Sequence, residues 1–153
     1  MTGLLSLLDS SHIACRSPAQ SQKNIFELLA KKIAESHPSL EKQVIAKQLL
    51  SREKLGSTGL GNGVAVPHSR IGGLEQPIGF LLTLESAVSY DAPDGLPVDV
   101  LFALLVPEES TQLHLDLLAE IATLLSDSQY CKGLRGATTA DELLTNAFVS
   151  QAA

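Results

Sequence analysis

The spacing of apolar residues predicts two helices in the first third of the chain. Apolar side chains recur at helical intervals from residue 22 to residue 36, and they follow Ser21, a residue type that commonly caps helices. Pro38 interrupts this pattern, and we expect Ser39 to cap a second helix. The residues expected to face inward are Ile25, Leu28, Leu29 and Ile33 in the first helix and Val44, Ile45 and Leu49 in the second.

Apolar runs in the middle of the chain predict strands. One runs from residue 78 to residue 84, and another, at 98–106, is so nearly continuous in apolar residues that we expect a central strand covered on both faces. Turn-forming residues at 91–97 separate the two runs. A shorter run at 64–66 predicts a buried strand that ends at Pro67, because proline lacks the N–H group that a β-ladder needs.

The last third of the chain predicts three more helices. Residues 110–125 carry a wide apolar face that includes Leu113, and a short helix is expected at about 127–134. The final helix begins with a capping-box pattern at 138–142. Its expected buried residues are Leu143, Leu144 and Phe148.

The first twenty residues are poorly defined by their pattern. Leu4, Leu5, Leu7 and Leu8 indicate a short amphipathic piece, and residues 12–15 indicate an edge strand. We find no internal repeat or linker, and the order of helices, strands and helices predicts one layered α/β domain over residues 1–153.

Composition and charge narrow the class of protein. The 44% of hydrophobic residues and 18% of charged residues are typical of a globular protein, and a net charge of −6 argues against nucleic-acid binding. Cys15 and Cys131 are far apart and have no metal or redox spacing, so we expect them to be reduced. The amino end lacks the basic region of a signal peptide, and no apolar run is long enough to cross a bilayer. We therefore expect a cytoplasmic protein that does not insert into the membrane.

The segment SREKLGSTGLGNGVAVPHSR, residues 51–70, concentrates the candidate chemistry. Four glycines fall within eight positions, and the apolar run that follows them ends at Pro67-His68. Glycine allows backbone conformations that other residues avoid and lets other groups approach the main chain closely. A histidine just past the end of a strand, beside such a loop, is well placed to be presented to a substrate. His68 is therefore our main candidate for the reacting residue.

Several alternative sites can be compared with this one. The glycines match neither the phosphate-binding loop, since Asn62 follows Gly61 where Lys is required, nor the dinucleotide-binding fingerprint. His114 lies at the edge of a helical apolar face, where a hydrogen-bonded structural histidine is the simpler interpretation. A zinc site formed by His68 and His114 would lack an obvious third ligand. No nucleophile elbow for a catalytic serine is present, and we expect no cofactor.

Histidine itself can serve as the covalent nucleophile. A neutral imidazole nitrogen can accept a phosphoryl group near neutral pH, since the unperturbed pKa of histidine is about 6.5. Phosphoryl transfer then depends mainly on positioning and on charge stabilisation. Arg52 is the best-placed arginine, because it opens the loop that His68 closes.

Residues 51–70 closely resemble the active-site segment of the mannitol/fructose-class enzyme IIA proteins of the phosphoenolpyruvate phosphotransferase system, and most of all its nitrogen-related branch, enzyme IIA-Ntr. Two further matching blocks are YDAPDGLPVDVLFALLV at 90–106 and the helix at 111–118 with its histidine. The resemblance implies a mixed β-sheet flanked by helices. It also implies that His68 accepts a phosphoryl group and that Arg52 and His114 stabilise it. The Ser69-Arg70 pair departs from the Gly-Lys of some relatives.

The same resemblance implies the partners and leaves two functions open. The phosphoryl donor would be NPr, a carrier similar to HPr. In one interpretation the protein regulates partners such as potassium-transport components or sensor kinases according to its phosphorylation state. In the alternative it is a sugar-specific EIIA that passes the group to an EIIB of a fructose- or mannitol-type permease. The nitrogen-branch resemblance and the absence of an attached EIIB domain from the sequence favour regulation.

Overall fold

The computed structural model describes residues 5–149, and within this range six strands form one mixed sheet. The strand order is β1-β5-β6-β3-β2, and β4 also pairs with β6. The long strands β5 and β6 run antiparallel, whereas β1 is parallel to β5, and β3 and β4 are parallel to β6. The strands are β1 (Ile13–Ser17), β2 (Gly59–Gly61), β3 (Val64–Ala65), β4 (His68–Ile71), β5 (Ile78–Val88) and β6 (Val98–Pro107).

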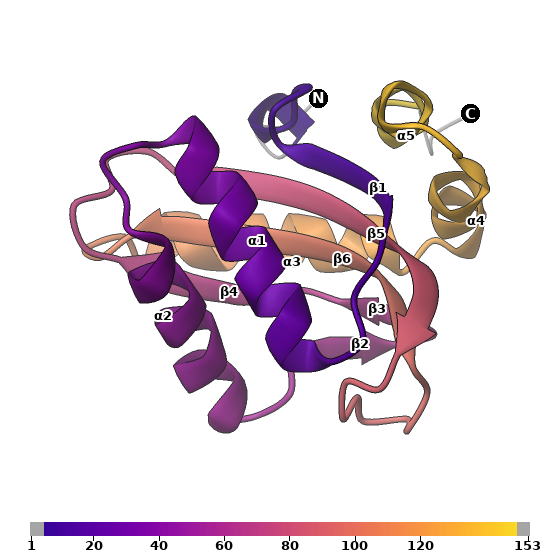
Figure 1. The fold of residues 1–153 in the computed structure, drawn as a ribbon, viewed down its shortest axis with the longest axis horizontal. Coiled ribbons are helices and arrows are strands. Elements are labelled where there is room, and N and C mark those ends of the chain that lie inside the picture. Colours follow the sequence, from indigo (N-terminus) through magenta and orange to yellow (C-terminus); the bar gives the residue numbers. More distant parts are fainter. Residues whose placement is uncertain (1–4, 150–153) are drawn as a thin grey trace.

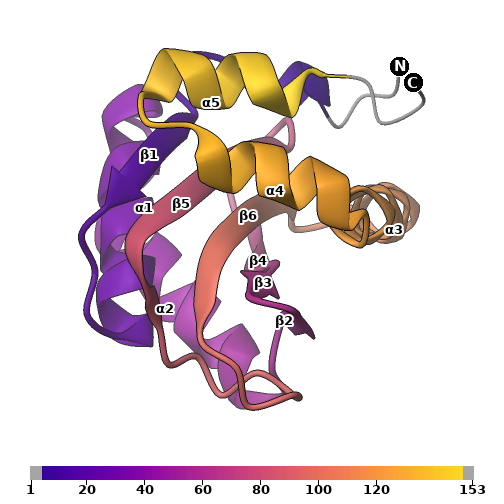
Figure 2. The same ribbon diagram turned by 90° about the vertical axis from the view of Figure 1, so that its right-hand side faces the viewer.

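Helices cover both faces of this sheet (Figures 1 and 2). One face carries α1 and α2, and the other carries α3 and α4, with α5 beside β1. The helices are η1 (Leu5–Leu7, a 3-10 turn), α1 (Gln22–Ser36), α2 (Lys42–Lys54), α3 (Gln112–Leu125), α4 (Ser128–Gly136) and α5 (Ala140–Ala147). The mixed sheet flanked by helices agrees with the expected fold class. No helix between residues 5 and 149 is both long and apolar enough to span a membrane.

Strand β6 is the centre of the hydrophobic core, as its apolar sequence predicts. From Val100 to Val106 its side chains alternate between two clusters, because successive residues of a strand point to opposite faces. Those that pack toward α3, α4 and α5 are Val100, Phe102, Leu104 and Val106, and those that pack toward α1 and α2 are Leu101, Ala103 and Leu105. The second long strand, β5, extends four residues beyond the predicted end at Leu84.

The two amino-terminal helices form largely where expected, with one wrong cap. The Ser21 hydroxyl accepts a hydrogen bond from the Asn24 N–H, so the first predicted cap is confirmed. Helix α2 begins at Lys42 instead of just after Ser39, because the intervening residues form a turn in which the Leu40 N–H donates to His37. Val44 is 43% exposed, since the buried stripe of this helix runs through Ile45 and Leu49.

The carboxyl-terminal helices also match, except at their ends. Leu113 is 42% exposed because the buried stripe of α3 begins one turn later, at Leu117. The Thr139 hydroxyl caps α5 by accepting from the Glu142 N–H, and the Glu142 carboxylate accepts from the Thr138 N–H. Phe148 is 49% exposed, contrary to expectation, because α5 ends at Ala147 and the next residue turns away from the core.

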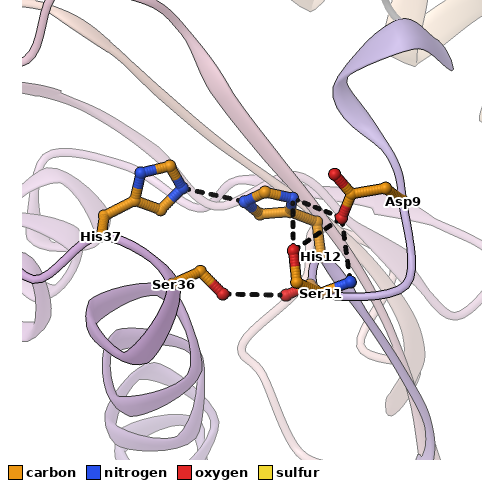
Figure 3. A network of polar contacts seen from close by, with 5 residues as sticks. All are labelled: Asp9, Ser11, His12, Ser36 and His37. Carbon is orange, nitrogen blue, oxygen red and sulfur yellow. Dashed lines mark hydrogen bonds and ion pairs between the residues drawn. The ribbon is translucent and has the colours of Figure 1, made fainter.

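The amino-terminal segment is fastened to the end of α1 by two histidines (Figure 3). The predicted edge strand is β1, and Leu4, part of the predicted amphipathic piece, lies outside the described residues. The Asp9 carboxylate accepts hydrogen bonds from Ser11 and from His12 Nδ1, at 2.9 Å from the imidazole. His12 Nε2 lies 2.9 Å from His37 Nε2, so these two nitrogens share one proton. Burial and the neighbouring His12 lower the pKa of His37.

Candidate active site

The glycine-rich segment forms a tight hairpin between α2 and the sheet. Strands β2 and β3 are antiparallel, and the Gly61–Asn62–Gly63 turn between them has three positive φ angles, of 93°, 57° and 81°. Glycine and asparagine are the residues that tolerate this left-handed region. The Asn62 N–H donates to the Asp94 carboxylate at 2.9 Å, so the hairpin is tied to the loop before β6.

His68 is the first residue of a short strand, which corrects the expectation that it merely follows one. Strand β3 ends at Ala65, one residue earlier than predicted, and after Pro67 the chain resumes as β4 along the same neighbour, with His68 opposite Leu104 of β6. The His68 Nδ1 atom lies 2.7 Å from the carbonyl oxygen of Val66. Since a carbonyl oxygen only accepts, Nδ1 carries the proton, and Nε2 is left with the free electron pair.

The three residues selected from sequence gather around one hollow. His68 and His114 lie with ring centroids 5.3 Å apart and their planes at 82°, so they meet edge to face. Both line a pocket of about 560 Å³ together with Arg52, and His68 and Arg52 also line a smaller adjoining hollow of about 230 Å³. The buried Nδ1 of His114 has no hydrogen-bond partner among the described residues. His114 is thus no satisfied core histidine, contrary to the simpler interpretation.

The charges in this pocket favour neutral imidazoles beside cations. Burial lowers the pKa of His68 to about 4, and the charges of Arg52 and His114 act in the same direction, whereas the bond to Val66 opposes them. Burial also lowers the pKa of His114, and the positive charges of Arg70 and Arg52 lower it further. At neutral pH the site therefore presents a nucleophilic nitrogen next to two guanidinium groups. That combination suits a reaction in which a neutral nitrogen receives an anionic group.

Two features of the site were not singled out from sequence. Arg70 lines the pocket and its Nε donates to the Ser110 carbonyl at 3.1 Å. It follows His68 by two positions in β4 and therefore shares its face, which became visible only once the structure showed this strand. The second feature is a buried contact of Glu53 and Thr58 with Tyr90, 32 positions beyond Thr58, which no local pattern indicates. Within residues 5–149 no three metal-ligating side chains converge, so the zinc alternative has only two histidines.

Comparisons with known proteins identify the family of this chain. Residues 6–147 match the family model for the phosphoenolpyruvate-dependent sugar phosphotransferase system, EIIA 2. A nitrogen regulatory protein from Pseudomonas aeruginosa is 43% identical over 143 residues, which cover 94% of this chain and 93% of that one.

Solved structures extend the comparison to the fold. The nitrogen regulatory protein IIA-Ntr from Neisseria meningitidis superposes with a TM-score of 0.87 at 37% identity, covering 95% of this chain and 99% of that one. The IIA mannitol structure from Escherichia coli has a TM-score of 0.74 at 17% identity and covers 92% of this chain and 98% of the other, a likeness of fold alone. The chain therefore belongs to the EIIA type 2 family of the phosphotransferase system, as a relative of the nitrogen regulatory IIA-Ntr proteins.

Proposed function

We propose that this protein is a cytoplasmic phosphoryl carrier that accepts a phosphoryl group on Nε2 of His68 from the HPr-like carrier NPr. The phosphorylated and unphosphorylated forms then regulate different partners, such as potassium-transport components or sensor kinases, in nitrogen and carbon metabolism. The observation that supports this most strongly is the 2.7 Å contact of His68 Nδ1 with the Val66 carbonyl, which leaves Nε2 free in a pocket that Arg52 also lines.

The transfer needs no change of proton on His68. The Nε2 electron pair attacks the phosphorus of the phosphohistidine on NPr, and the new N–P bond forms as the old one breaks. The ring of NPr, protonated on its other nitrogen before transfer, takes the electron pair of the broken bond and leaves as a neutral imidazole. The ring of His68 becomes cationic as the N–P bond forms, while Nδ1 keeps its proton and donates its N–H to the Val66 carbonyl throughout. Arg52 and His114 are proposed to stabilise the phosphoryl oxygens by charge and hydrogen bonding.

An apolar rim around the pocket supports docking of a protein donor. Leu55 lines the larger hollow and is 85% exposed, and Leu60 lines the smaller one and is 45% exposed. Large exposed apolar residues beside a functional pocket commonly mark a protein contact. A phosphoryl group adds roughly −1.5 to −2 charges at the centre of this surface, taking other phosphorylated side chains as a guide. Such a change is large enough to favour one partner and repel another.

The experiment that tests the proposal is transfer of labelled phosphate from phosphorylated NPr. Wild type is expected to gain acid-labile phosphate, and His68→Gln to gain none, whereas His37→Gln, remote from the pocket, should label normally. Labelling of His68→Gln would move the acceptor to another residue. Failure of folded wild type to accept from an active donor would contradict the carrier function.

A second comparison tests the two supporting residues. Arg52→Gln and His114→Gln are expected to slow labelling by about tenfold or more, because each would remove a hydrogen bond to a charged group worth about 1.5–3 kcal/mol. Lys54→Gln is the matched control, since it removes an exposed cation of the same helix turn. Equal rates in Arg52→Gln and Lys54→Gln would remove Arg52 from the mechanism.

The sugar-specific alternative is tested with the phosphorylated protein. Mixed with an EIIB of a fructose- or mannitol-type permease, it is expected to keep its phosphoryl group over the time in which it returns the group to NPr. Rapid loss to the EIIB would support the sugar pathway instead. Pull-downs with the two forms of the protein would then identify which partners depend on phosphorylation.

A further inference from the structure

We propose that a buried cluster of Glu53, Thr58 and Tyr90 is a positioning device that sets both His68 and Arg52 for phosphoryl transfer. The inference rests on the proposed function above and adds residues that do not themselves touch the phosphoryl group. The cluster joins three separate segments, the last turn of α2, the loop that follows it, and the residues after β5.

The three side chains form a closed set of hydrogen bonds. One carboxylate oxygen of Glu53 accepts from the Thr58 N–H at 2.9 Å, and the other accepts from the Thr58 hydroxyl at 2.6 Å. Because that hydroxyl donates to Glu53, its free electron pair accepts from the Tyr90 hydroxyl at 2.9 Å. The Tyr90 hydroxyl also reaches Glu53 at 3.4 Å. Thr58 is consequently held by its backbone and its side chain together.

A chain of backbone contacts leads from Thr58 to the nucleophile. The Thr58 carbonyl accepts from the Val66 N–H at 2.9 Å, and the carbonyl of Val66 is the group that accepts from His68 Nδ1 at 2.7 Å. Fixing Thr58 therefore fixes the residue that determines which nitrogen of His68 carries the proton. A shift of this peptide would turn the imidazole and weaken the preference for a free Nε2.

The cluster acts on Arg52 through the same loop. Arg52 and Glu53 are neighbours in the last turn of α2, and the Arg52 guanidinium donates to the Gly56 carbonyl at 2.9 Å. The bond from the Thr58 N–H to the Glu53 carboxylate bridges the two ends of the loop at 53–58. The bond from Arg52 to the Gly56 carbonyl bridges the first part of the same loop. Both bonds hold the guanidinium at the pocket before any anion is bound. Groups placed in advance lose little freedom when the reaction occurs.

Tyr90 anchors this arrangement in the core. It is only 1% exposed, its ring meets Phe26 of α1 edge to face at 6.1 Å, and its carbonyl accepts from the Gln22 side chain at 3.0 Å. Burial and the charge of Glu53 raise the pKa of Tyr90, so the phenol remains a donor over the working pH range. The position of the site is thereby tied to the packing of α1 on the sheet.

The test compares hydroxyl deletions in the cluster with equal deletions elsewhere. Thr58→Val and Tyr90→Phe each remove one buried hydroxyl, as do the controls Thr83→Val and Tyr130→Phe, whose hydroxyls bond to Arg16 N and to the Ala147 carbonyl. With NPr as donor, the cluster variants are expected to lower the maximal transfer rate by about ten- to hundredfold with little change in KM. The controls should stay within about twofold of wild type, and Thr58→Ser, which keeps the hydroxyl, should restore the rate.

A second readout does not depend on phosphoryl transfer. Nitrogen NMR of the unphosphorylated protein reports the tautomer of His68, and wild type is expected to show a protonated Nδ1 and a bare Nε2. Thr58→Val and Tyr90→Phe should move these signals toward a mixture of tautomers, and the controls should not. If wild type accepts no phosphate, the carrier function fails while this test still stands. Unchanged His68 signals in both cluster variants, or transfer rates equal to those of the controls, would overturn the positioning role.

Discussion

His68 combines two properties that are usually opposed, a partly buried imidazole and a reactive nitrogen. Burial removes water from the ring and lowers its pKa to about 4, so the imidazole stays neutral where an exposed histidine would be partly charged. The carbonyl of Val66 then assigns the remaining proton to Nδ1. In the proposed reaction the nucleophile is thus prepared by the main chain of its own segment, two residues earlier, and the arginines of the pocket are left to interact with the incoming anion.

The lowered pKa of His68 predicts how its reactivity changes with pH. Protonation of Nε2 would remove the electron pair that attacks phosphorus, so the capacity to accept phosphate should persist from pH 8 down to about pH 5 and decline with a midpoint near 4. An NMR titration of the His68 ring in the unphosphorylated protein measures this midpoint directly. A midpoint near 6.5, the ordinary value for histidine, would show that burial does not control the ring.

Single residues also show how far the sequence could identify the site. His68, His114 and Arg52 were found because they fall in contiguous motifs, and the structure places all three at one pocket. Tyr90 belongs to a matching block, yet its bond to Thr58 spans 32 positions and follows no helical or strand period. Contacts of that kind arise from tertiary packing alone, so sequence reasoning had no means of finding them.

At the scale of elements, long periodic runs predicted the helices and strands well, and two of the three predicted caps, Ser21 and the capping box of α5, were confirmed. The long runs that became α1, β5, β6 and α3 were all predicted, because their burial repeats over several turns or pairs. Strand β4 was missed, since four residues between a proline and two glycines carry too short a pattern. Ser39 failed as a cap because a turn closed by His37 and Leu40 already used those residues. A short strand such as β4 is stabilised by pairing with a strand far away in the sequence, here β6, and the local pattern of residues does not indicate that pairing.

The hairpin that precedes His68 provides a test at this scale. A Cβ atom at Gly63, where φ is +81°, would lie 2.7 Å from Nη2 of Arg135, which donates to the Asn62 carbonyl, while Nε of the same side chain donates to Asp99. Gly63→Ala is therefore expected to lower the free energy of unfolding by about 2–4 kcal/mol, from backbone strain and displaced hydrogen bonds. Urea denaturation measures the change.

A glycine in open space serves as the control for this substitution. Gly133 lies inside helix α4, and a Cβ atom there would meet no heavy atom within 4 Å. Gly133→Ala should raise the free energy of unfolding by about 0.5–1 kcal/mol, because alanine favours the helix. If both variants changed stability in the same direction and by similar amounts, the close packing of Gly63 against Arg135 would not be a structural constraint.

At the scale of the whole molecule, the sheet separates two packed cores, and the pocket lies where α2, β4 and the start of α3 meet. The mixed sheet flanked by helices was predicted correctly, since the resemblance in motifs extended over most of the chain. Because the pocket lies where three elements meet, phosphorylation would add its negative charge to a surface that all three elements share. Such a location suits a regulator, because partners that contact several elements can detect a change at one histidine.

Three histidines link the stability of the molecule to pH. The pKa of His37, His68 and His114 is lowered in the folded protein, mainly by burial. The unfolded chain binds protons near pH 6.5, where the folded one does not, so the free energy of unfolding should decrease as pH falls below 6.5. Thermal unfolding between pH 8 and pH 4 measures this, and His68→Gln should flatten the profile. A melting temperature that rises on acidification over this range would contradict the pKa directions.

The measurement that tests the central claim most directly is NMR of the protein after phosphorylation by NPr, with nitrogen-15 in its histidines. Coupling between phosphorus and a ring nitrogen identifies the bonded atom without relying on a substitution. The geometry at Val66 predicts coupling to Nε2 of His68, with Nδ1 still bound to the carbonyl. Phosphorus on Nδ1 of His68, or on His114, would contradict the account.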